Sequence, residues 1–374
     1  MSSNDLEQPL HNTVGRDSEA VSNSKVHRLR STFGGQELTD EIAEKGSQSG
    51  FGGKKIGWLG SWSLLFNNIT GPGMISLISV YITCGWLPAT ALLVVVGLIS
   101  AQVSVYLIDA MQMVPGNENF EKRVELMYLA KRYLGRPLYW LSMFFFLLNM
   151  QLNNIGSIIV STQQMDWTIM ACGVPSYALE LAPNFTFVAT KNQTANLDDS
   201  PFGDAYVISI GFLIVLAATV PLGYLNLDDN IWVQIICAFI LGGVVFVAWL
   251  YEFFEEGFDW DSLPAFGDDI GAQIGNIFFN YAYVITIPSW INEKKDCVNA
   301  KTSIWTSLIP SVLLFCIVGA LGSLTTIVGV ETRDSAGQGL DLTVALGGAG
   351  IKPFARIATF VFPWVALVNG VPVM

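Results

Sequence analysis

Histidine is nearly absent from this chain of 374 residues, and the two that occur, His11 and His27, both lie near the N-terminus. The five cysteines are widely scattered and form no CxxC or Cys/His cluster of the kind that holds zinc or an iron–sulfur centre. Charged residues make up 13% of the chain. These absences argue against metal catalysis and remove the usual general base, so no enzyme activity, catalytic residue or metal site is expected.

Apolar residues, in contrast, account for 52% of the chain. A helix needs about 20 apolar residues to cross a bilayer, and stretches of that kind recur from Ile56 onward. The sequence therefore predicts an all-α integral membrane protein with about eight transmembrane helices, surrounded by lipid and with no nucleic-acid partner. The expected spans are 57–84, 87–113, 137–163, 204–222, 231–251, 272–290, 303–330 and 353–374.

The first 55 residues have a different composition from the rest. They contain seven of the 19 Lys and Arg residues, are rich in Ser, Gly and Asn, and include no apolar run. Residues 1–55 are therefore predicted to be a disordered cytoplasmic N-terminal tail rather than a cleaved signal, and residues 56–374 to be the transmembrane domain.

Basic residues in the short loops predict the orientation in the membrane. Eight of them fall in the loops after spans two and six, against four in the loops after spans one, three, five and seven. Because basic loops stay in the cytosol, this distribution predicts a multi-pass protein with a cytoplasmic N-terminus. The eight are Lys122, Arg123, Lys131, Arg132, Arg136, Lys294, Lys295 and Lys301.

Two glycosylation sequons lie in the long loop after span three, beginning at Asn184 and Asn192. Glycans are added on the lumenal side, so both triplets agree with this orientation, although such triplets also arise by chance in Thr-rich loops. A third triplet, at Asn68, lies inside span one and should stay unmodified. Cys84 and Cys172 are the two cysteines placed on the oxidising side, so they either form a disulfide or remain free thiols.

Span one is interrupted by the segment Asn68-Ile-Thr-Gly-Pro-Gly-Met74. Pro72 donates no amide and clashes with the preceding turn, while Gly71 and Gly73 leave the backbone unrestrained. An unwound segment is tolerable in hydrocarbon where it is buried in protein or lines a wet cavity. The segment is therefore either a ligand site, with a helix start near Met74 facing an anion such as a carboxylate, or a proline kink with glycines for close packing.

Span six carries a second polar centre. Its segment Phe279-Asn-Tyr-Ala-Tyr283 precedes Pro288, and the span could be discontinuous there, although the aromatic side chains are equally suited to packing. Spans one and six hold corresponding places in two successive five-helix units and would cross the bilayer in opposite directions, which is typical of inverted repeats.

These residues resemble the amino acid/auxin permeases, a family of transmembrane amino acid transporters. The most specific segments are Asn68–Met74, Pro115-Gly-Asn, Phe120-Glu-Lys-Arg-Val-Glu125, and Phe279–Tyr283 continuing through Pro288-Ser-Trp-Ile-Asn-Glu293. The resemblance implies a leucine-transporter-type inverted repeat. It departs at Ile75-Ser-Leu-Ile78, where many members have a proline. It also departs at the end of the chain, because Met374 falls within the eighth span and leaves the second repeat incomplete, which suggests a truncated gene model or an eight-span protein covered by a partner.

The resemblance also implies the activity: secondary active transport of small amino acids, coupled to protons or sodium, without another cofactor. The resemblance implies that substrate binds between spans one, three, six and eight, near the two broken helices. The candidate residues are Asn68, Thr70, Gly71, Gly73, Met74, Asn153, Phe279, Asn280 and Tyr281. Asn153 belongs to a polar cluster in span three that either lines the substrate path or joins helices by hydrogen bonds. The host membrane is either the plasma membrane or a vacuolar or lysosomal membrane. The alternative function is that of a transporter-like amino acid sensor that moves little substrate.

Overall fold

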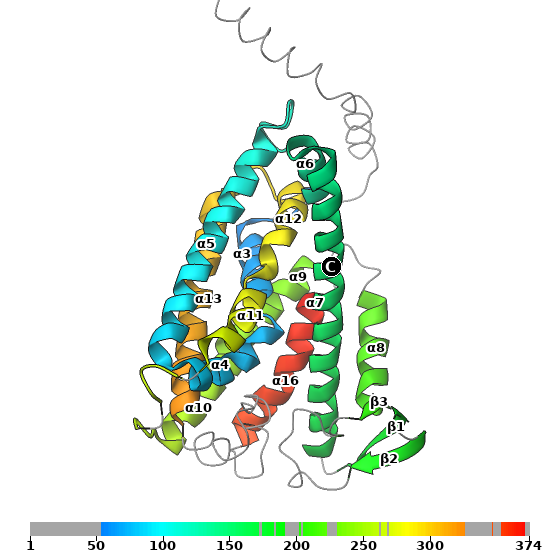
Figure 1. Ribbon diagram of the computed structural model, residues 1–374, viewed down its shortest axis with the longest axis vertical. Coiled ribbons are helices and arrows are strands. Elements are labelled where there is room, and N and C mark those ends of the chain that lie inside the picture. The colour runs from blue at the N-terminus through cyan, green and yellow to red at the C-terminus, as the bar shows by residue number, and fades with distance from the viewer. Residues whose placement is uncertain are drawn as a thin grey trace, which may run out of the picture.

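The structure is a computed structural model in which the main body of the chain forms a bundle of helices (Figure 1). The structure describes residues 54–171, 174–182, 185–190, 202, 205–222, 230–261, 263–267, 269–325, 346 and 353–370. Most of the predicted N-terminal tail lies outside these described residues, as do Cys172, Asn184 and Asn192.

Span one is not a single helix. It consists of α3 (Trp58–Ile69), a 3-10 helix η1 (Pro72–Ser76) and α4 (Leu77–Cys84). Gly85 then reverses the chain with a φ of 82°, a backbone conformation that glycine adopts at little cost. The reversal leads directly into α5 (Trp86–Gln112), which forms span two as one continuous helix.

The next part of the chain contains the longest helix and a small sheet. The amphipathic α6 (Leu126–Tyr133) precedes α7 (Gly135–Ala171), which forms span three. Strands β1 (Ser176–Ala182), β2 (Thr186–Thr190) and β3 (Tyr206–Ser209) follow as an antiparallel sheet in the order β2-β1-β3. The sheet lies at the far end of α7 from α6, beside α8 (Ile210–Leu222) (Figure 1).

The second half of the bundle begins with three segments that together make span five: α9 (Ile231–Phe239), the π-helix η2 (Ile240–Val245) and α10 (Phe246–Glu256). Span six is divided into α11 (Ile270–Asn280), the 3-10 helix η3 (Ala282–Thr286) and α12 (Ile287–Glu293). Spans seven and eight are α13 (Ala300–Leu324) and α16 (Pro353–Gly370).

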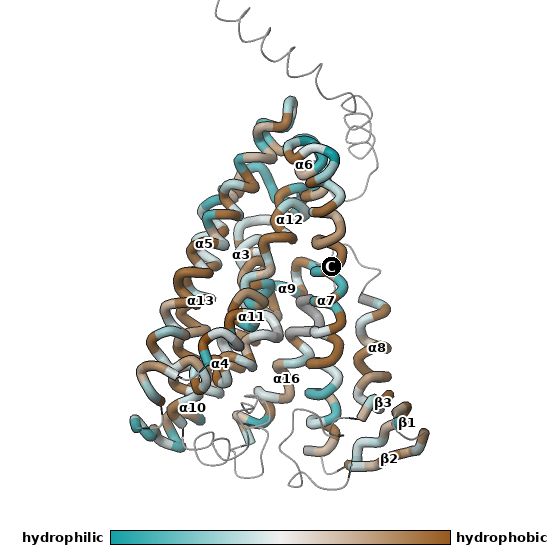
Figure 2. Tube along the Cα trace, viewed as in Figure 1, coloured by the Kyte–Doolittle hydropathy of each residue, from teal (hydrophilic) through white to brown (hydrophobic). Residues whose placement is uncertain are grey.

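Each of the eight predicted spans therefore overlaps helix. Among the described residues, four helical stretches are long and apolar enough to cross a membrane: Trp86–Gln112, Gly135–Met170, Ile231–Glu256 and Ala300–Leu324. Apolar residues are common along the bundle, and hydrophilic residues gather near its two ends, around α6 and near α10 (Figure 2). The protein is mostly helical, as the sequence predicts.

The core lies around spans one, five and seven, because α3 packs between α9 and α13 while α4 packs on α13 and α5. Ser307 donates its hydroxyl to the Trp62 carbonyl at 3.2 Å, and Trp62 Nε1 donates to the Thr306 carbonyl at 3.1 Å. The indole of Trp249 donates to Thr359 at 3.1 Å and joins α10 to α16. These bonds satisfy polar groups that would be costly inside an apolar bundle.

Two elements differ from the sequence prediction. Residues 164–203 are predicted as an outer loop, but α7 continues through this region to Ala171, and β1 and β2 follow it. Asp166 explains the longer helix, because its buried carboxylate accepts bonds from the Ser176 and Ser209 hydroxyls and from the Gly211 amide at 2.9 Å. The π-helix in span five was also not predicted, although the Gly242-Gly243 pair within it is a place where helices deform.

Candidate functional site

The break in span one begins where α3 ends. Thr70 leaves helical geometry at φ −84° and ψ 41°, and Gly71 is extended at φ −72° and ψ −163° before Pro72 starts the 3-10 turn. The amide of Met74 donates to the Gly71 carbonyl at 3.1 Å, so the turn itself uses this amide. A proline is well suited to the first turn because it has no amide to leave unpaired.

The break in span six is at Tyr281. This residue has a φ of −109° and a ψ of 18°, and it separates α11 from the 3-10 helix η3. Pro288 then occupies the first turn of α12, as Pro72 does in η1. Both discontinuities suggested by the sequence are therefore present.

The two broken spans run antiparallel and are joined at both ends. At the end that carries α6, the Ile56 amide donates to the Glu293 carbonyl at 3.2 Å, and the Lys295 amide donates to the Ile56 carbonyl at 2.9 Å. At the opposite end, the Gly267 amide donates to the Cys84 carbonyl at 2.7 Å. The breaks consequently face each other in the middle of the bundle, where α11 passes beside α4 (Figure 1).

Gly73 lies close to Asn280, so the two breaks approach each other there. A Cβ atom placed on Gly73 would lie 2.6 Å from Asn280 Oδ1 and 2.9 Å from Phe279 Cδ1, distances shorter than van der Waals contact. A Cβ atom on Gly71 would have the Asn68 carbonyl oxygen at 3.9 Å as its nearest neighbour. Only one of the two glycines is therefore required for space.

Two buried polar atoms on residues beside the breaks, one on Asn280 and one on Asn68 near the end of α3, have no hydrogen-bond partner among the described residues. Asn280 is 4% exposed, and its amide donates to the Asn276 carbonyl at 2.8 Å, while its Oδ1 accepts no hydrogen bond from the described residues. The buried Nδ2 of Asn68 likewise has no partner among them. A buried unpaired polar atom costs about 1–3 kcal/mol, so each of these atoms favours a polar ligand.

Three other predicted residues border the same junction. Met74 is fully buried, and Thr70 is almost so, with its hydroxyl donating to the Phe66 carbonyl at 2.7 Å. This bond ends α3 by using one of its last carbonyl groups. Phe279 is 38% exposed and contributes the ring edge that approaches Gly73. The three side chains lie around the breaks, and the Thr70 hydroxyl already donates to a carbonyl group of α3.

Tyr281 and Asn153 are placed differently. The Tyr281 hydroxyl donates to the Leu93 carbonyl of α5 at 2.8 Å, and its ring meets Phe315 edge-on with centroids 5.9 Å apart. This is the geometry of a residue that packs span six against spans two and seven. Asn153 lies on α7, which contacts η1, but its side chain makes no hydrogen bond within the described part of the chain.

A contact between span five and the residues before the break in span one was not predicted from the sequence. Asn67 donates its amide to both the backbone carbonyl and the side-chain oxygen of Gln234, at 2.8 and 2.9 Å, and both residues are buried. Gln234 in an otherwise apolar span is the signal that could have identified this contact. The π-helix η2 follows within the same span, and Gly242 faces the ring of Phe66 just before the break.

Ion pairs surround the end of the bundle that carries α6. Arg123 pairs with the mostly buried Glu293 at 3.1 Å, and Lys301 pairs with Asp109 at 2.7 Å. Each acid is paired with a base from another segment, so the two pairs hold helix ends and the loop before α6 together at this end of the bundle.

Burial also affects Lys294 at this end of the bundle. Loss of water lowers the pKa of Lys294, whereas the ammonium of Lys54 lowers the pKa of the exposed Asp296 by donating a hydrogen bond to it. Within the described residues, no group of three or more His, Cys, Asp or Glu side chains could hold a metal ion. The polar chemistry of the breaks is therefore that of amides, hydroxyls and backbone groups.

Comparison with known proteins places this architecture in a family. The family model described as transmembrane amino acid transporter protein matches residues 54–326, more than half of the chain, and covers both broken spans. No curated protein and no solved structure gave a match. On the strength of the family match, the chain belongs to the transmembrane amino acid transporter family.

Proposed function

We propose that this protein is a secondary active transporter that binds a small amino acid between the breaks of spans one and six and carries it across a membrane. Membership of the amino acid transporter family supports the substrate class. The energy would come from a proton or sodium gradient, and the host membrane would be the plasma membrane or a vacuolar or lysosomal membrane.

The observation that carries the proposal is the apposition of Gly73 and Asn280. Two helices are broken next to each other, and a glycine brings the backbone of one break against an unpaired amide oxygen of the other. That oxygen accepts hydrogen bonds, so it suits the ammonium group of an amino acid. Asn68 Nδ2 donates, so it suits the carboxylate.

The proposed topology is a leucine-transporter-type inverted repeat with a cytoplasmic N-terminus. The antiparallel course of the two broken spans supports the repeat, because corresponding helices of inverted units cross the bilayer in opposite directions. The orientation is supported by basic residues at the end of the bundle that carries α6, among them Arg123, Lys131 and Arg132.

The experiment that tests this function is uptake of radiolabelled amino acids by purified protein in liposomes, with proton and sodium gradients imposed separately. We expect uptake of at least one amino acid above that of protein-free liposomes, and dependence on one of the two gradients. Failure of every amino acid under both gradients would refute transport. Saturable amino acid binding without uptake would instead identify the transporter-like sensor that is the alternative function.

A further inference from the structure

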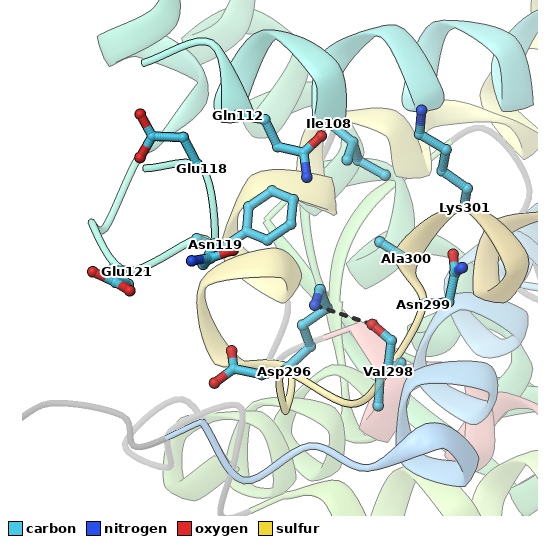
Figure 3. A pocket seen from close by; sticks show the side chains of 12 residues that line it. Ile108, Gln112, Glu118, Asn119, Glu121, Asp296, Val298, Asn299, Ala300 and Lys301 are labelled. Carbon is cyan, nitrogen blue, oxygen red and sulfur yellow. Dashed lines mark hydrogen bonds between the residues drawn. The ribbon is translucent and has the colours of Figure 1, made fainter. Parts of the chain in front are cut away.

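A pocket of about 530 Å³ lies away from the breaks, at the end of the bundle that carries α6. Its walls come from three places: the end of α5, the loop that precedes α6, and the segment that joins α12 to α13 (Figure 3). The loop is held by Asn117, which is fully buried, donates to the Met111 carbonyl at 2.9 Å and accepts from the Lys122 amide at 2.8 Å. The pocket therefore has fixed walls.

Lys294 supplies a buried positive charge to this pocket. It is 4% exposed, and its Nζ donates to the Val298 carbonyl at 3.1 Å (Figure 3). In the part of the chain that the structure describes, no carboxylate lies within ion-pairing distance of this Nζ, and nearby Asp296 is paired with Lys54. An ammonium group has three donors, and a buried charge without a counter-ion is costly.

Phe120 covers the same ammonium group. The Lys294 Nζ lies 5.0 Å from the centroid of its ring, within range of a cation–π interaction. Phe120 has a φ of 58°, which is unusual for a residue with a large side chain. The loop therefore accepts an unfavourable backbone conformation where its ring meets the buried cation. Strained residues of this kind cluster at ligand sites.

The rest of the lining suits an organic molecule with one negative group. The amide of Gln112 points into the pocket in Figure 3, and this side chain has no hydrogen-bond partner among the described residues. Ile108, Val298 and Ala300 add apolar surface. Lys301, the other lysine of the lining, is already paired with Asp109. Among the lining residues, the Lys294 ammonium and the Gln112 amide are therefore available to bind a ligand, next to apolar walls.

We propose that this pocket binds the carboxylate of a small organic monoanion, with the Lys294 ammonium and the Gln112 amide as its ligands and the apolar side chains around its body. Three acids of the lining, Glu118, Glu121 and Asp296, disfavour anions of higher charge, so a carboxylate fits better than a phosphate dianion. This proposal does not rest on the proposed transport function. A bound molecule would connect the loop before α6 to the segment after α12, which is where the broken spans are joined.

Thermal unfolding of the purified full-length protein tests the proposal, with butyrate as the probe, uncharged butyramide as its analogue, and chloride to hold ionic strength constant. We expect butyrate to raise Tm saturably, butyramide to leave it unchanged, and inorganic phosphate to act more weakly. Lys294→Met should weaken butyrate binding by about tenfold or more, because a charge-assisted hydrogen bond is lost. Lys295→Met, an equal charge change at the exposed neighbouring residue, should retain the full response.

Two further variants test whether a lost butyrate response reflects misfolding and whether butyrate binds at the breaks instead. Without ligand, Lys294→Met should unfold at the same or a higher temperature, because it removes a buried unpaired charge. Gly73→Val, which fills the junction of the broken spans, should keep the butyrate response. Equal butyrate responses in wild type and Lys294→Met, a butyramide response as large as that of butyrate, phosphate acting as strongly as butyrate, or loss of the response in Gly73→Val would each overturn the proposal.

Discussion

At the scale of single residues, the two glycines of the first break show what a sequence reveals and what it conceals. The pattern Gly71-Pro72-Gly73 predicts an interrupted helix, and the interruption is present. Neither glycine has a positive φ, so the backbone conformation does not require glycine at either position. Gly73 is required because a side chain there would have no space beside Asn280. A contact between residues more than 200 positions apart could not be derived from local backbone preferences.

The first prediction compares these glycines. Gly73→Val should abolish uptake per molecule while the protein still reaches its membrane, because the new side chain displaces Asn280 and fills the junction. Gly71→Ala is the matched control and should transport normally, because its Cβ atom has room and its extended backbone suits any residue. Surface abundance and uptake are measured together. Normal uptake per molecule in Gly73→Val would mean that the site lies elsewhere.

Asn280→Ala removes the unpaired oxygen at the junction without adding bulk. We expect apparent affinity for the transported amino acid to fall by about tenfold to a hundredfold, the equivalent of about 1–3 kcal/mol for a lost buried polar contact. Concentration dependence of uptake measures the change. An unaltered half-saturation concentration would show that this oxygen does not contact substrate.

Tyr281→Phe tests the packing role that the structure gives to Tyr281. Loss of the hydrogen bond to the Leu93 carbonyl should lower the free energy of unfolding by about 1 kcal/mol. Substrate affinity should stay within a factor of about two, because the hydroxyl faces α5 rather than the junction. A large loss of substrate affinity with unchanged thermal stability would show that Tyr281 binds substrate rather than packing the helices.

At the scale of elements, apolar runs predict helices well because burial of the backbone in a membrane leaves few alternatives. The eight expected ranges accordingly overlap helix. The β1–β3 sheet depends on contacts between separate segments, such as the hydrogen bonds that Asp166 accepts from Ser176 and Ser209. Local composition does not contain that information.

The contact between Arg123 and Glu293 joins the loop before α6 to the end of α12, so its loss should loosen this end of the bundle. We expect Arg123→Gln and Glu293→Gln each to lower Tm, and the double variant to be less destabilised than the sum of the two. A double-mutant cycle should give a coupling of about 1 kcal/mol. Strictly additive effects would show that the pair does not stabilise the end of the bundle that carries α6.

At the scale of the whole molecule, composition excludes a soluble domain, and the loop charges predict one orientation. Asn184 and Asn192 lie outside the described residues, whereas the Asn68 side chain is in the bundle with a buried Nδ2 atom. We predict glycan on Asn192 and Asn184 and none on Asn68. Glycosidase treatment should lower the apparent mass of the wild type but not that of the Asn184→Gln/Asn192→Gln variant. An unchanged wild-type mass, together with a cytosolic reporter signal from this loop, would reverse the orientation.

The most direct test of the account is a density map, by single-particle electron microscopy, of the full-length protein saturated with the amino acid that it binds best and held by an antibody fragment. We predict ligand density between η1 and η3, within hydrogen-bonding distance of Asn280 Oδ1 and next to Gly73. Ligand density elsewhere in the bundle, with Asn280 still against Gly73, would contradict the assignment of the substrate site.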